Sequence, residues 1–265
     1  MRTVLVIGIG AGDPEHLTLQ AVSALGRADV VVIIDKGDAK DDLTALRTAI
    51  LEQHRPDGRY RLVVAPEVDR DRGTEVERDD GRYRDVVVDW QDRRAELYRE
   101  MLTAELADGE TAAFLVWGDP ALYDGTLRLL DRVVADQPDD GWTIVSVPGI
   151  SSVSALAAAH RLILNRVGRP VLITTGRRIA EGMPADVDDV VVMLDGRTAF
   201  AALPAEQRAE LHVYWGAYLG TPDELLVAGP LDEVADEIVA VRTQARERKG
   251  WIMDTYLLRR GAGDR

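Results

Sequence analysis

A buried strand that runs directly into a glycine-rich turn constrains the fold of this chain more than any other feature. Residues 4–14 read VLVIGIGAGDP, in which four aliphatic residues precede Gly8, Gly10 and Gly12. The apolar run predicts a buried strand, and the glycines let the backbone turn tightly or approach a ligand closely. A helical segment is expected at 15–25. This order is typical of an open α/β domain, whose ligands bind beyond the carboxyl ends of the strands.

The same stretch does not match the dinucleotide-binding fingerprint. The GxGxxG pattern requires a third small residue where this chain has Asp13, a charge at the place of the pyrophosphate. Because a helix N-terminus favours a carboxylate as well as a phosphate, Asp13 can simply cap the helix. NAD or FAD binding is therefore disfavoured. Two readings stay open: a turn without a ligand, and one wall of a pocket for another kind of molecule.

Composition narrows the function further. The net charge of −14 argues against a general nucleic-acid binder and against binding to an anionic membrane, but it permits an anionic small molecule in an arginine-lined pocket. The absence of cysteine excludes disulfides and thiolate chemistry and fits a reducing cytoplasm. The first apolar run is too short for a signal peptide or a membrane span, so we expect a soluble, cytoplasmic protein. The four histidines show no metal-ligand spacing, and no metal is predicted.

Further strand and helix patterns alternate along the chain and predict two α/β domains. After the first strand, the first half is expected to hold strands at 28–35, 61–66, 111–117 and 142–147, and helices at 43–54, 93–106, 127–134 and 153–161. Charge-dense residues 69–84 predict a solvated or mobile loop. A linker-like NRVGRP at 165–170 places the boundary between domains 1–165 and 166–265. The second domain is expected to hold strands at 171–175, 190–194, 211–215, 225–227 and 251–258, with a helix at 231–246.

Polar residues follow several of the predicted strands, where they would gather at one edge of a parallel sheet. Asp35 and Lys36 end the second strand, either as substrate-facing groups or as an exposed ion pair. Asp119 follows the fourth strand in WGDP, either accepting hydrogen bonds from a ligand or capping a turn. Ser151 and Ser152 precede an Ala/Leu run after the fifth strand, so one of them is expected to be a helix N-cap. They do not form the G-x-S-x-G elbow of a hydrolase.

These blocks occur in a recognisable order. They are GIGAGDP at 8–14, WGDPALYDGT at 117–126, PGISS at 148–152, VVVMLDG at 190–196 and GTPDE at 220–224. Together they resemble the tetrapyrrole (corrin/porphyrin) methylase family of S-adenosylmethionine-dependent transferases, and the resemblance covers the whole chain. It implies a parallel-sheet N-terminal domain, a mixed-sheet C-terminal domain, S-adenosylmethionine in the cleft between them, and a homodimer.

A closer match within the family rests on further segments, among them IDKG at 34–37, TTGRR at 174–178 and GWIMDTYLLRR at 250–260. That branch acts in aerobic cobalamin synthesis, where it methylates C1 of precorrin-5 and releases the C20 acetyl group as acetate. The resemblance therefore implies a small-molecule tetrapyrrole substrate, together with a second step that needs water and a general base.

The resemblance assigns candidate roles to individual residues. The cofactor is expected to contact Trp117, Gly118, Asp119, Leu122, Ser151, Ser152, Met193, Leu194, Ala217 and Leu219. The opening loop, through Gly10 and Gly12, is expected to face the tetrapyrrole. Candidates for the acid–base step are Asp13, Asp35 and Asp119, with Lys36 as a charge stabiliser. A group of arginines near the linker either binds substrate carboxylates or is only solvated surface: Arg161, Arg166, Arg169, Arg177 and Arg178.

Rival functions remain open at this stage. The same fold family includes a diphthine-forming enzyme and a ribosomal RNA ribose methylase, of which the RNA substrate is disfavoured by the acidic charge. A different enzyme class, an NAD-dependent oxidoreductase, is disfavoured by Asp13. A non-catalytic ligand-binding module would bind the cofactor without transferring a methyl group.

Overall fold

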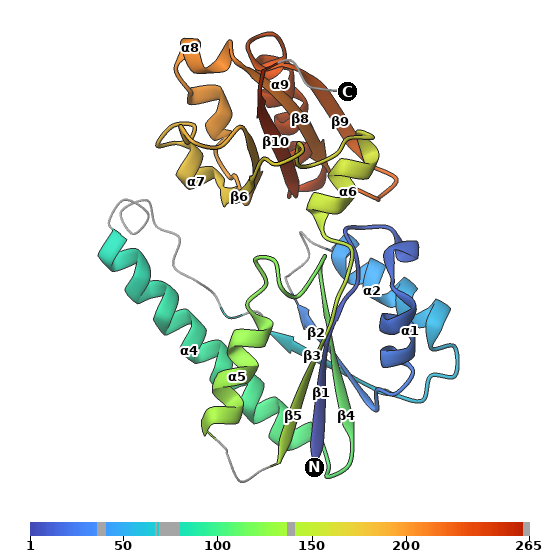
Figure 1. The fold of residues 1–265 in the computed structure, drawn as a ribbon. Helices are drawn as coiled ribbons and strands as arrows, with labels where there is room; N and C mark the ends of the chain where they lie inside the picture. The colour runs from blue at the N-terminus through green and yellow to red at the C-terminus, as the bar shows by residue number, and fades with distance from the viewer. Residues whose placement is uncertain (36–40, 67, 69–79, 137–140, 262–265) are drawn as a thin grey trace. The chain divides into compact units, whose positions relative to one another are not determined.

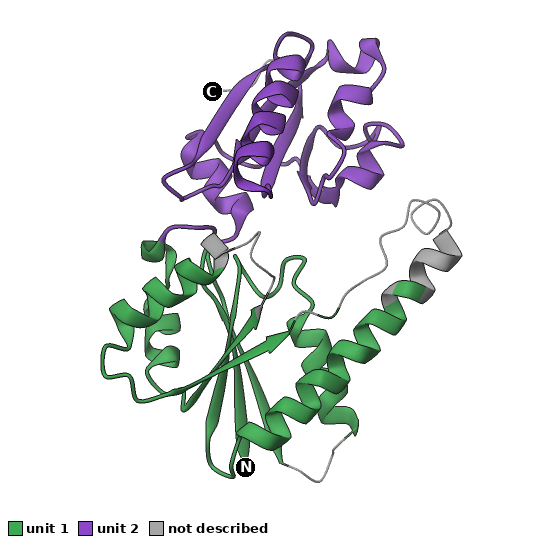
Figure 2. Cartoon of the chain, turned by 180° about the vertical axis from the view of Figure 1, so that it is seen from behind, with its two compact units in different colours: residues 1–10, 14–150 green, residues 11–13, 151–265 purple. Residues whose placement is uncertain are grey.

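A computed structural model describes residues 1–35, 41–66, 68, 80–136 and 141–261. The chain divides into two compact units (Figure 2). Unit 1 comprises residues 1–10 and 14–150, and unit 2 comprises residues 11–13 and 151–265. Unit 1 is built on a parallel sheet and unit 2 on a mixed sheet, which confirms the predicted fold class.

The sheet of unit 1 has the strand order β3-β2-β4-β1-β5, with every pair parallel (Figure 1). Its strands are β1 (Arg2–Gly8), β2 (Val30–Asp35), β3 (Arg61–Pro66), β4 (Thr111–Val116) and β5 (Trp142–Val147). The positions agree closely with those predicted, but the order differs from the 3-2-1-4-5-6 order of the dinucleotide-binding fold. Because β1 lies between β4 and β5, the turns that follow these three strands are neighbours.

Helices cover both faces of this sheet, which explains why β1 reads as a continuous apolar run. Val4 and Val6 pack in one hydrophobic cluster with residues of α4 and α5, whereas Leu5 and Ile7 pack in another with residues of α1 and α2. Figure 1 shows the two helix pairs on opposite sides of the strands. The helices are α1 (Leu19–Leu25), α2 (Asp41–His54), α4 (Asp80–Glu105) and α5 (Thr126–Asp136).

Helix α4 is longer than its predicted range of 93–106. It begins at Asp80, so residues 80–84 are helical and not part of a loop, while residues 69–79 lie outside the described part of the chain. Dense charge predicts a loop, but a solvated helix also carries charge and is stabilised by ion pairs between residues four apart. Arg93 and Asp89 form such a pair at 3.0 Å.

The sheet of unit 2 has the order β6-β7-β10-β8-β9, in which only β6 and β7 pair in parallel. Its strands are β6 (Val171–Thr175), β7 (Asp189–Met193), β8 (Leu211–Ala217), β9 (Leu225–Pro230) and β10 (Asp254–Arg260). Strand β10 starts at Asp254, three residues after Trp251, where the sequence predicts the last strand to begin. That indole instead packs edge-on against the Tyr218 ring, with centroids 5.0 Å apart.

The packing of helix α6 sets the boundary between the two units. The helices of unit 2 are α6 (Ser152–Ala159), α7 (Gly176–Ile179), α8 (Ala205–Arg208) and α9 (Leu231–Lys249). Because α6 packs against β8 and β10, it belongs to unit 2, and the division falls after residue 150 and not after the predicted residue 165. None of the helices in the described part of the chain is long and apolar enough to cross a membrane.

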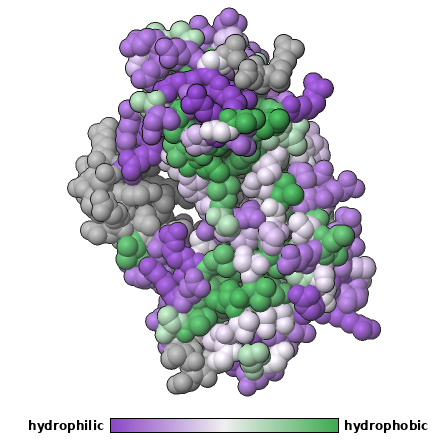
Figure 3. Space-filling model, in the orientation of Figure 1, coloured by the Kyte–Doolittle hydropathy of each residue, from purple (hydrophilic) through white to green (hydrophobic). Residues whose placement is uncertain are grey.

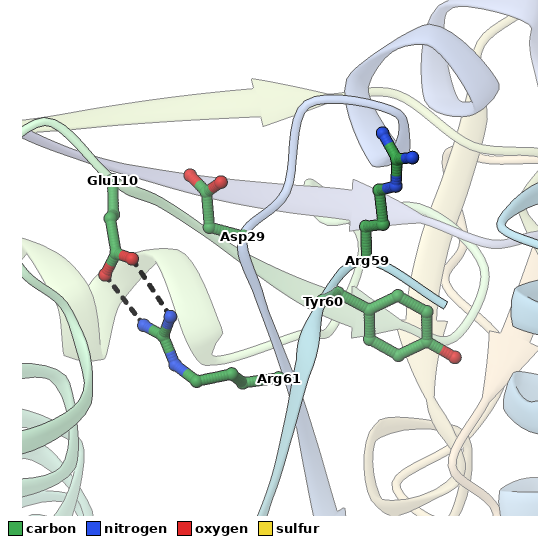
Figure 4. Close-up of a pocket in the computed structure, with 5 residues that line it drawn as sticks. All are labelled: Asp29, Arg59, Tyr60, Arg61 and Glu110. Atoms are coloured by element: carbon green, nitrogen blue, oxygen red, sulfur yellow. Dashed lines mark hydrogen bonds and ion pairs between the residues drawn. The ribbon is translucent and has the colours of Figure 1, made fainter. Parts of the chain in front are cut away.

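A pocket of about 250 Å³ lies at the amino ends of β2, β3 and β4 (Figure 4). Its lining residues are Asp29, Arg59, Tyr60, Arg61 and Glu110. The Arg61 guanidinium donates to both oxygens of Glu110, at 2.9 and 2.7 Å. Ligands of open α/β sheets bind at the opposite edge. We therefore assign this ion pair the structural role of fixing β3 to the start of β4.

Replacement of Glu110 is expected to change the acid stability of the protein. The hydrogen bonds from Arg61 and the Ala107 amide lower the Glu110 pKa from 4.5 to about 2. A depressed carboxyl pKa stabilises the folded state above the unfolded-state value, and this contribution is lost as the pH falls through the folded-state value. Glu110→Gln should therefore be less stable than the wild type above pH 4.5, with the difference vanishing towards pH 2.

Urea denaturation across this pH window measures the effect. Glu52→Gln, which changes an exposed carboxylate on α2, is the matched control and should show little difference at any pH. A difference between wild type and Glu110→Gln that stays constant through the window would contradict the assignment.

Candidate functional site

The turns after β1, β4 and β5 meet backbone to backbone at the carboxyl edge of unit 1, forming what we call the glycine junction (Gly8, Gly10, Gly118 and Gly149). A Cβ atom on Gly149 would lie 2.2 Å from the Gly118 carbonyl oxygen, and one on Gly8 would lie 2.7 Å from the same oxygen. The Gly118 amide donates to the Gly10 carbonyl at 2.8 Å, and the Gly10 amide donates back at 3.3 Å. Side chains are therefore excluded where these turns cross.

Asp119 braces the glycine junction. Its Oδ1 accepts from the Ala121 amide at 2.7 Å, and its Oδ2 accepts from the Gly149 amide at 2.9 Å. The first bond caps the turn after β4, and the second ties that turn to the one after β5. Of the two interpretations that the sequence allowed, the turn cap is the one the structure contains. A contact of Asp119 with a cofactor stays a prediction.

The paired serines open unit 2 at the start of α6. The Ser151 Oγ accepts from the Ser154 amide at 3.2 Å, with Ser151 in an extended backbone conformation. This confirms that one of the two serines is the N-cap. Ser152 is the first helical residue and is half-buried.

Backbone strain gathers beside the predicted cofactor contacts. Five non-glycine residues of the described chain have positive φ, and three of them are Tyr123 (φ 54°), Leu194 (φ 53°) and Tyr218 (φ 50°). Tyr123 follows Leu122, and Tyr218 lies between Ala217 and Leu219. Such conformations each cost about 1–3 kcal/mol and cluster at ligand sites. The positive φ values are independent of the sequence motifs, and they fall in the turns after β4, β7 and β8, which also contain predicted cofactor contacts.

The two ends of the opening loop pack differently. Gly10 has φ +85°, and a Cβ there would lie 2.2 Å from the His16 Cβ. A Cβ on Gly12 would lie 2.4 Å from the Leu219 carbonyl oxygen. Packing alone therefore requires glycine at both positions, whether or not they also contact a tetrapyrrole. Asp13 is half-buried.

The acid–base candidates of the second strand lie at the limit of the described chain. Asp35 is the last residue of β2, and its side chain is not described. Lys36 lies outside the described residues.

Local acids neutralise much of the predicted arginine group. Arg166 and Arg169 both approach Asp188, at 3.8 and 3.9 Å. Arg178 pairs with Glu181 at 3.1 Å, and both side chains are exposed. Arg161 and Arg177 are exposed as well. Arg166, Arg169 and Arg178 therefore each have a carboxylate nearby, and the binding of substrate carboxylates by some of the five arginines stays a prediction.

Two buried polar residues near strand ends were not singled out from the sequence. Asp195 is 6% exposed and follows Leu194 at the end of β7. Arg47 of α2 is 6% exposed, and its Nε donates to the Leu115 carbonyl at 3.1 Å. Burial lowers the Arg47 pKa to about 10, against the raising effect of the Asp124 charge. The LDG turn could have indicated Asp195, but a single arginine within a helical pattern gives no such signal.

Among the described residues, no group of three histidines or acids gathers in a way that could hold a metal.

The two sheets and the ordered strand-end blocks define a class of protein. The sequence profile of the Tetrapyrrole (Corrin/Porphyrin) Methylases matches residues 3–235. The chain therefore belongs to this family, and it is an S-adenosylmethionine-dependent methyltransferase.

Particular relatives are similar over nearly the whole chain. The precorrin-6A synthase [deacetylating] of a Sinorhizobium species is 45% identical over 264 residues, covering 99% of this chain and 97% of that protein. The precorrin-2 C(20)-methyltransferase of a Sinorhizobium species is 33% identical over 215 residues, covering 78% and 80%. The crystal structure of a cobalamin synthesis related protein (CobF) from Corynebacterium diphtheriae superimposes with a TM-score of 0.80 at 38% identity. That match covers 99% of this chain and 100% of the other.

The glycine junction gives a direct prediction about folding. Gly149→Ala should lower the free energy of unfolding by about 1–3 kcal/mol or more, because its Cβ would collide with backbone that cannot rotate away. Gly125→Ala is the matched control, since a Cβ there would have no atom within 4 Å. Thermal denaturation of both variants measures the effect. Equal melting temperatures for the two variants would contradict the close packing described.

Proposed function

We propose that this chain transfers the methyl group of S-adenosylmethionine to C1 of precorrin-5 and releases the C20 acetyl group as acetate, giving precorrin-6A. The carrying observation is the 45% identity to a precorrin-6A synthase [deacetylating] over almost the full length of both chains. The acidic charge of −14 disfavours the alternative of an RNA substrate within the family.

We propose that the cofactor contacts strand-end segments of both units. The candidates are Trp117, Gly118, Asp119, Leu122, Ser151, Ser152, Met193, Leu194, Ala217 and Leu219. Apolar side chains and backbone polar groups of this kind suit an adenosine and an amino-acid moiety, with a few placed groups fixing the orientation. The positive φ values of Tyr123, Leu194 and Tyr218 support the fit, because they turn the backbone sharply at these segments.

The chemistry demands little acid–base catalysis for the methyl transfer itself. When bound, S-adenosylmethionine supplies an activated methyl group on a sulfonium. The residues of this chain hold the reacting carbon in line with that methyl group and exclude water from it. Gly10 and Gly12 of the opening loop are proposed to face the tetrapyrrole macrocycle.

Loss of the acetyl group needs more from the protein. Water adds to the acetyl carbonyl, the bond from C20 to the acetyl carbon breaks, its electron pair stays with the macrocycle, and acetic acid leaves. A general base must accept a proton from the water. Asp13 and Asp35 are the proposed bases, with Lys36 stabilising negative charge. We also propose that the chain works as a homodimer in the cytoplasm.

Methyl-labelled S-adenosylmethionine and precorrin-5 provide the test of this activity. Mass spectrometry should find one labelled methyl group on the macrocycle, and analysis of the small molecules should find one acetate for each methyl transferred. Methyl transfer without acetate would limit the proposal to a methyltransferase of another precorrin. Cofactor binding without any methyl transfer would favour a ligand-binding module.

The exposed arginines of α7 provide a second test. A charge-assisted hydrogen bond to a substrate carboxylate contributes roughly 1.5–3 kcal/mol, so Arg177→Ala should raise the KM for the tetrapyrrole about tenfold or more. Arg178→Ala should raise it as well, because Arg178 is exposed on the same short helix. Steady-state kinetics with both variants measure the difference. An unchanged KM for both would remove these residues from the substrate site.

A further inference from the structure

Leu194 adopts a conformation that its own contacts do not explain. It has φ 53°, and its relative exposure is 66%. Exposed apolar residues are common on protein surfaces, and Figure 3 shows hydrophobic residues among hydrophilic ones on its visible face, so exposure alone says little. A left-handed conformation in a branched aliphatic residue is different, because it is unfavourable and no burial of the side chain offsets it.

The residue that follows Leu194, Asp195, is held by several hydrogen bonds. Its Oδ1 accepts from the Arg197 amide at 3.0 Å, and its Oδ2 accepts from the Ala199 amide at 2.7 Å. The Tyr256 hydroxyl of β10 donates to the same Oδ2 at 2.7 Å, and an Arg242 nitrogen of α9 donates to the Asp195 backbone carbonyl at 2.8 Å. We call Asp195, Tyr256 and Arg242 the Asp195 clamp. It fixes the residue that follows Leu194 through both its side chain and its backbone.

The clamp is anchored in the core of unit 2. Arg242 also pairs with Asp254 at 2.9 Å, and Asp254 accepts from the Trp215 indole at 2.9 Å. The Tyr256 ring is 1% exposed and packs edge-on against Phe200, with centroids 5.0 Å apart. Burial, and then the charge of Asp195, raise the Tyr256 pKa, so the phenol stays a neutral donor. At the other side, a Cβ on Gly176 would lie 2.3 Å from the Asp195 Cγ, so α7 closes directly onto the carboxylate.

We propose that the Asp195 clamp is a positioning device that holds Leu194 in its left-handed conformation so that the turn after β7 is presented to S-adenosylmethionine. This inference rests on the proposed function, in which Leu194 contacts the cofactor. Asp195, Tyr256 and Arg242 act through that turn and do not themselves touch the cofactor. A rigid supporting group of this kind improves binding because the turn is ordered before the ligand arrives.

Adjacent residues on β10 offer a matched pair of variants. Tyr256→Phe keeps the ring against Phe200 and removes only the hydrogen bond to Asp195. Thr255→Val removes an equally buried hydrogen bond, from the Thr255 hydroxyl to the Val192 carbonyl at 2.9 Å, which does not involve the clamp. Both lose one buried hydrogen bond between β10 and the β7 region. They therefore separate positioning from general stability.

Isothermal titration with S-adenosylhomocysteine, at a temperature where all variants are folded, is the experiment. The proposal expects Tyr256→Phe to weaken binding about fivefold, as for one lost buried hydrogen bond, and Thr255→Val to bind within about twofold of the wild type. In steady state, Tyr256→Phe should raise the KM for S-adenosylmethionine and leave kcat nearly unchanged. Leu194→Ala should weaken binding as well. Asp195→Asn, which keeps one acceptor oxygen, should bind more tightly than Asp195→Ala.

Several results would overturn the proposal. A purely structural clamp would lower the melting temperature of Tyr256→Phe and leave its affinity for S-adenosylhomocysteine equal to that of Thr255→Val. Weak binding by Leu194→Ala with normal binding by Tyr256→Phe would keep the cofactor contact and remove the positioning role. Normal binding by both would remove the contact at Leu194, even if the wild-type chain methylates precorrin-5. Failure of the proposed function has a different signature, namely a wild-type chain that does not methylate precorrin-5.

Discussion

The close backbone packing of three strand-end turns is the constraint on which unit 1 depends. Cβ atoms on Gly8 and Gly149 would lie 2.7 and 2.2 Å from the Gly118 carbonyl oxygen, and Asp119 links the two later turns by its hydrogen bond from the Gly149 amide. A parallel sheet places the carboxyl ends of its strands at one edge. The strand order that sets β1 between β4 and β5 brings these glycines together. The glycines of the opening turn are therefore required for backbone packing, whether or not they also contact a ligand.

Unit 2 shapes its strand ends by other means. Its turns after β7 and β8 contain Leu194 and Tyr218 in left-handed conformations, and buried polar groups hold both. Asp195 fixes the first turn, and the Tyr218 hydroxyl donates to the Trp251 carbonyl at 2.6 Å to fix the second. A glycine leaves a turn without a side chain. Leu194 and Tyr218, in turns fixed by hydrogen bonds, each place a side chain in a defined position. That difference suits segments proposed to grip a ligand.

The sequence predicts the strands well because each is a short apolar run bounded by turn residues, as at 61–66 and 171–175. It does not predict the start of α4, because charge density favours a solvated helix as much as a loop. The sequence allows Asp119 to be a ligand contact or a turn cap, since one carboxylate suits either, and the cap is evident only from the positions of the Ala121 and Gly149 amides. The role of Asp195 depends on Tyr256, sixty-one residues away, which no local pattern contains.

The central proposal is that the segments after β4, β5, β7 and β8, and not the opening glycine loop, bind the methyl donor. A crystal structure of the protein with S-adenosylhomocysteine tests it most directly. The account predicts density for the ligand against Gly118–Leu122, Leu194 and Ala217–Leu219. Density for the ligand on Gly8–Gly12, with those turns free of contact, would contradict the account.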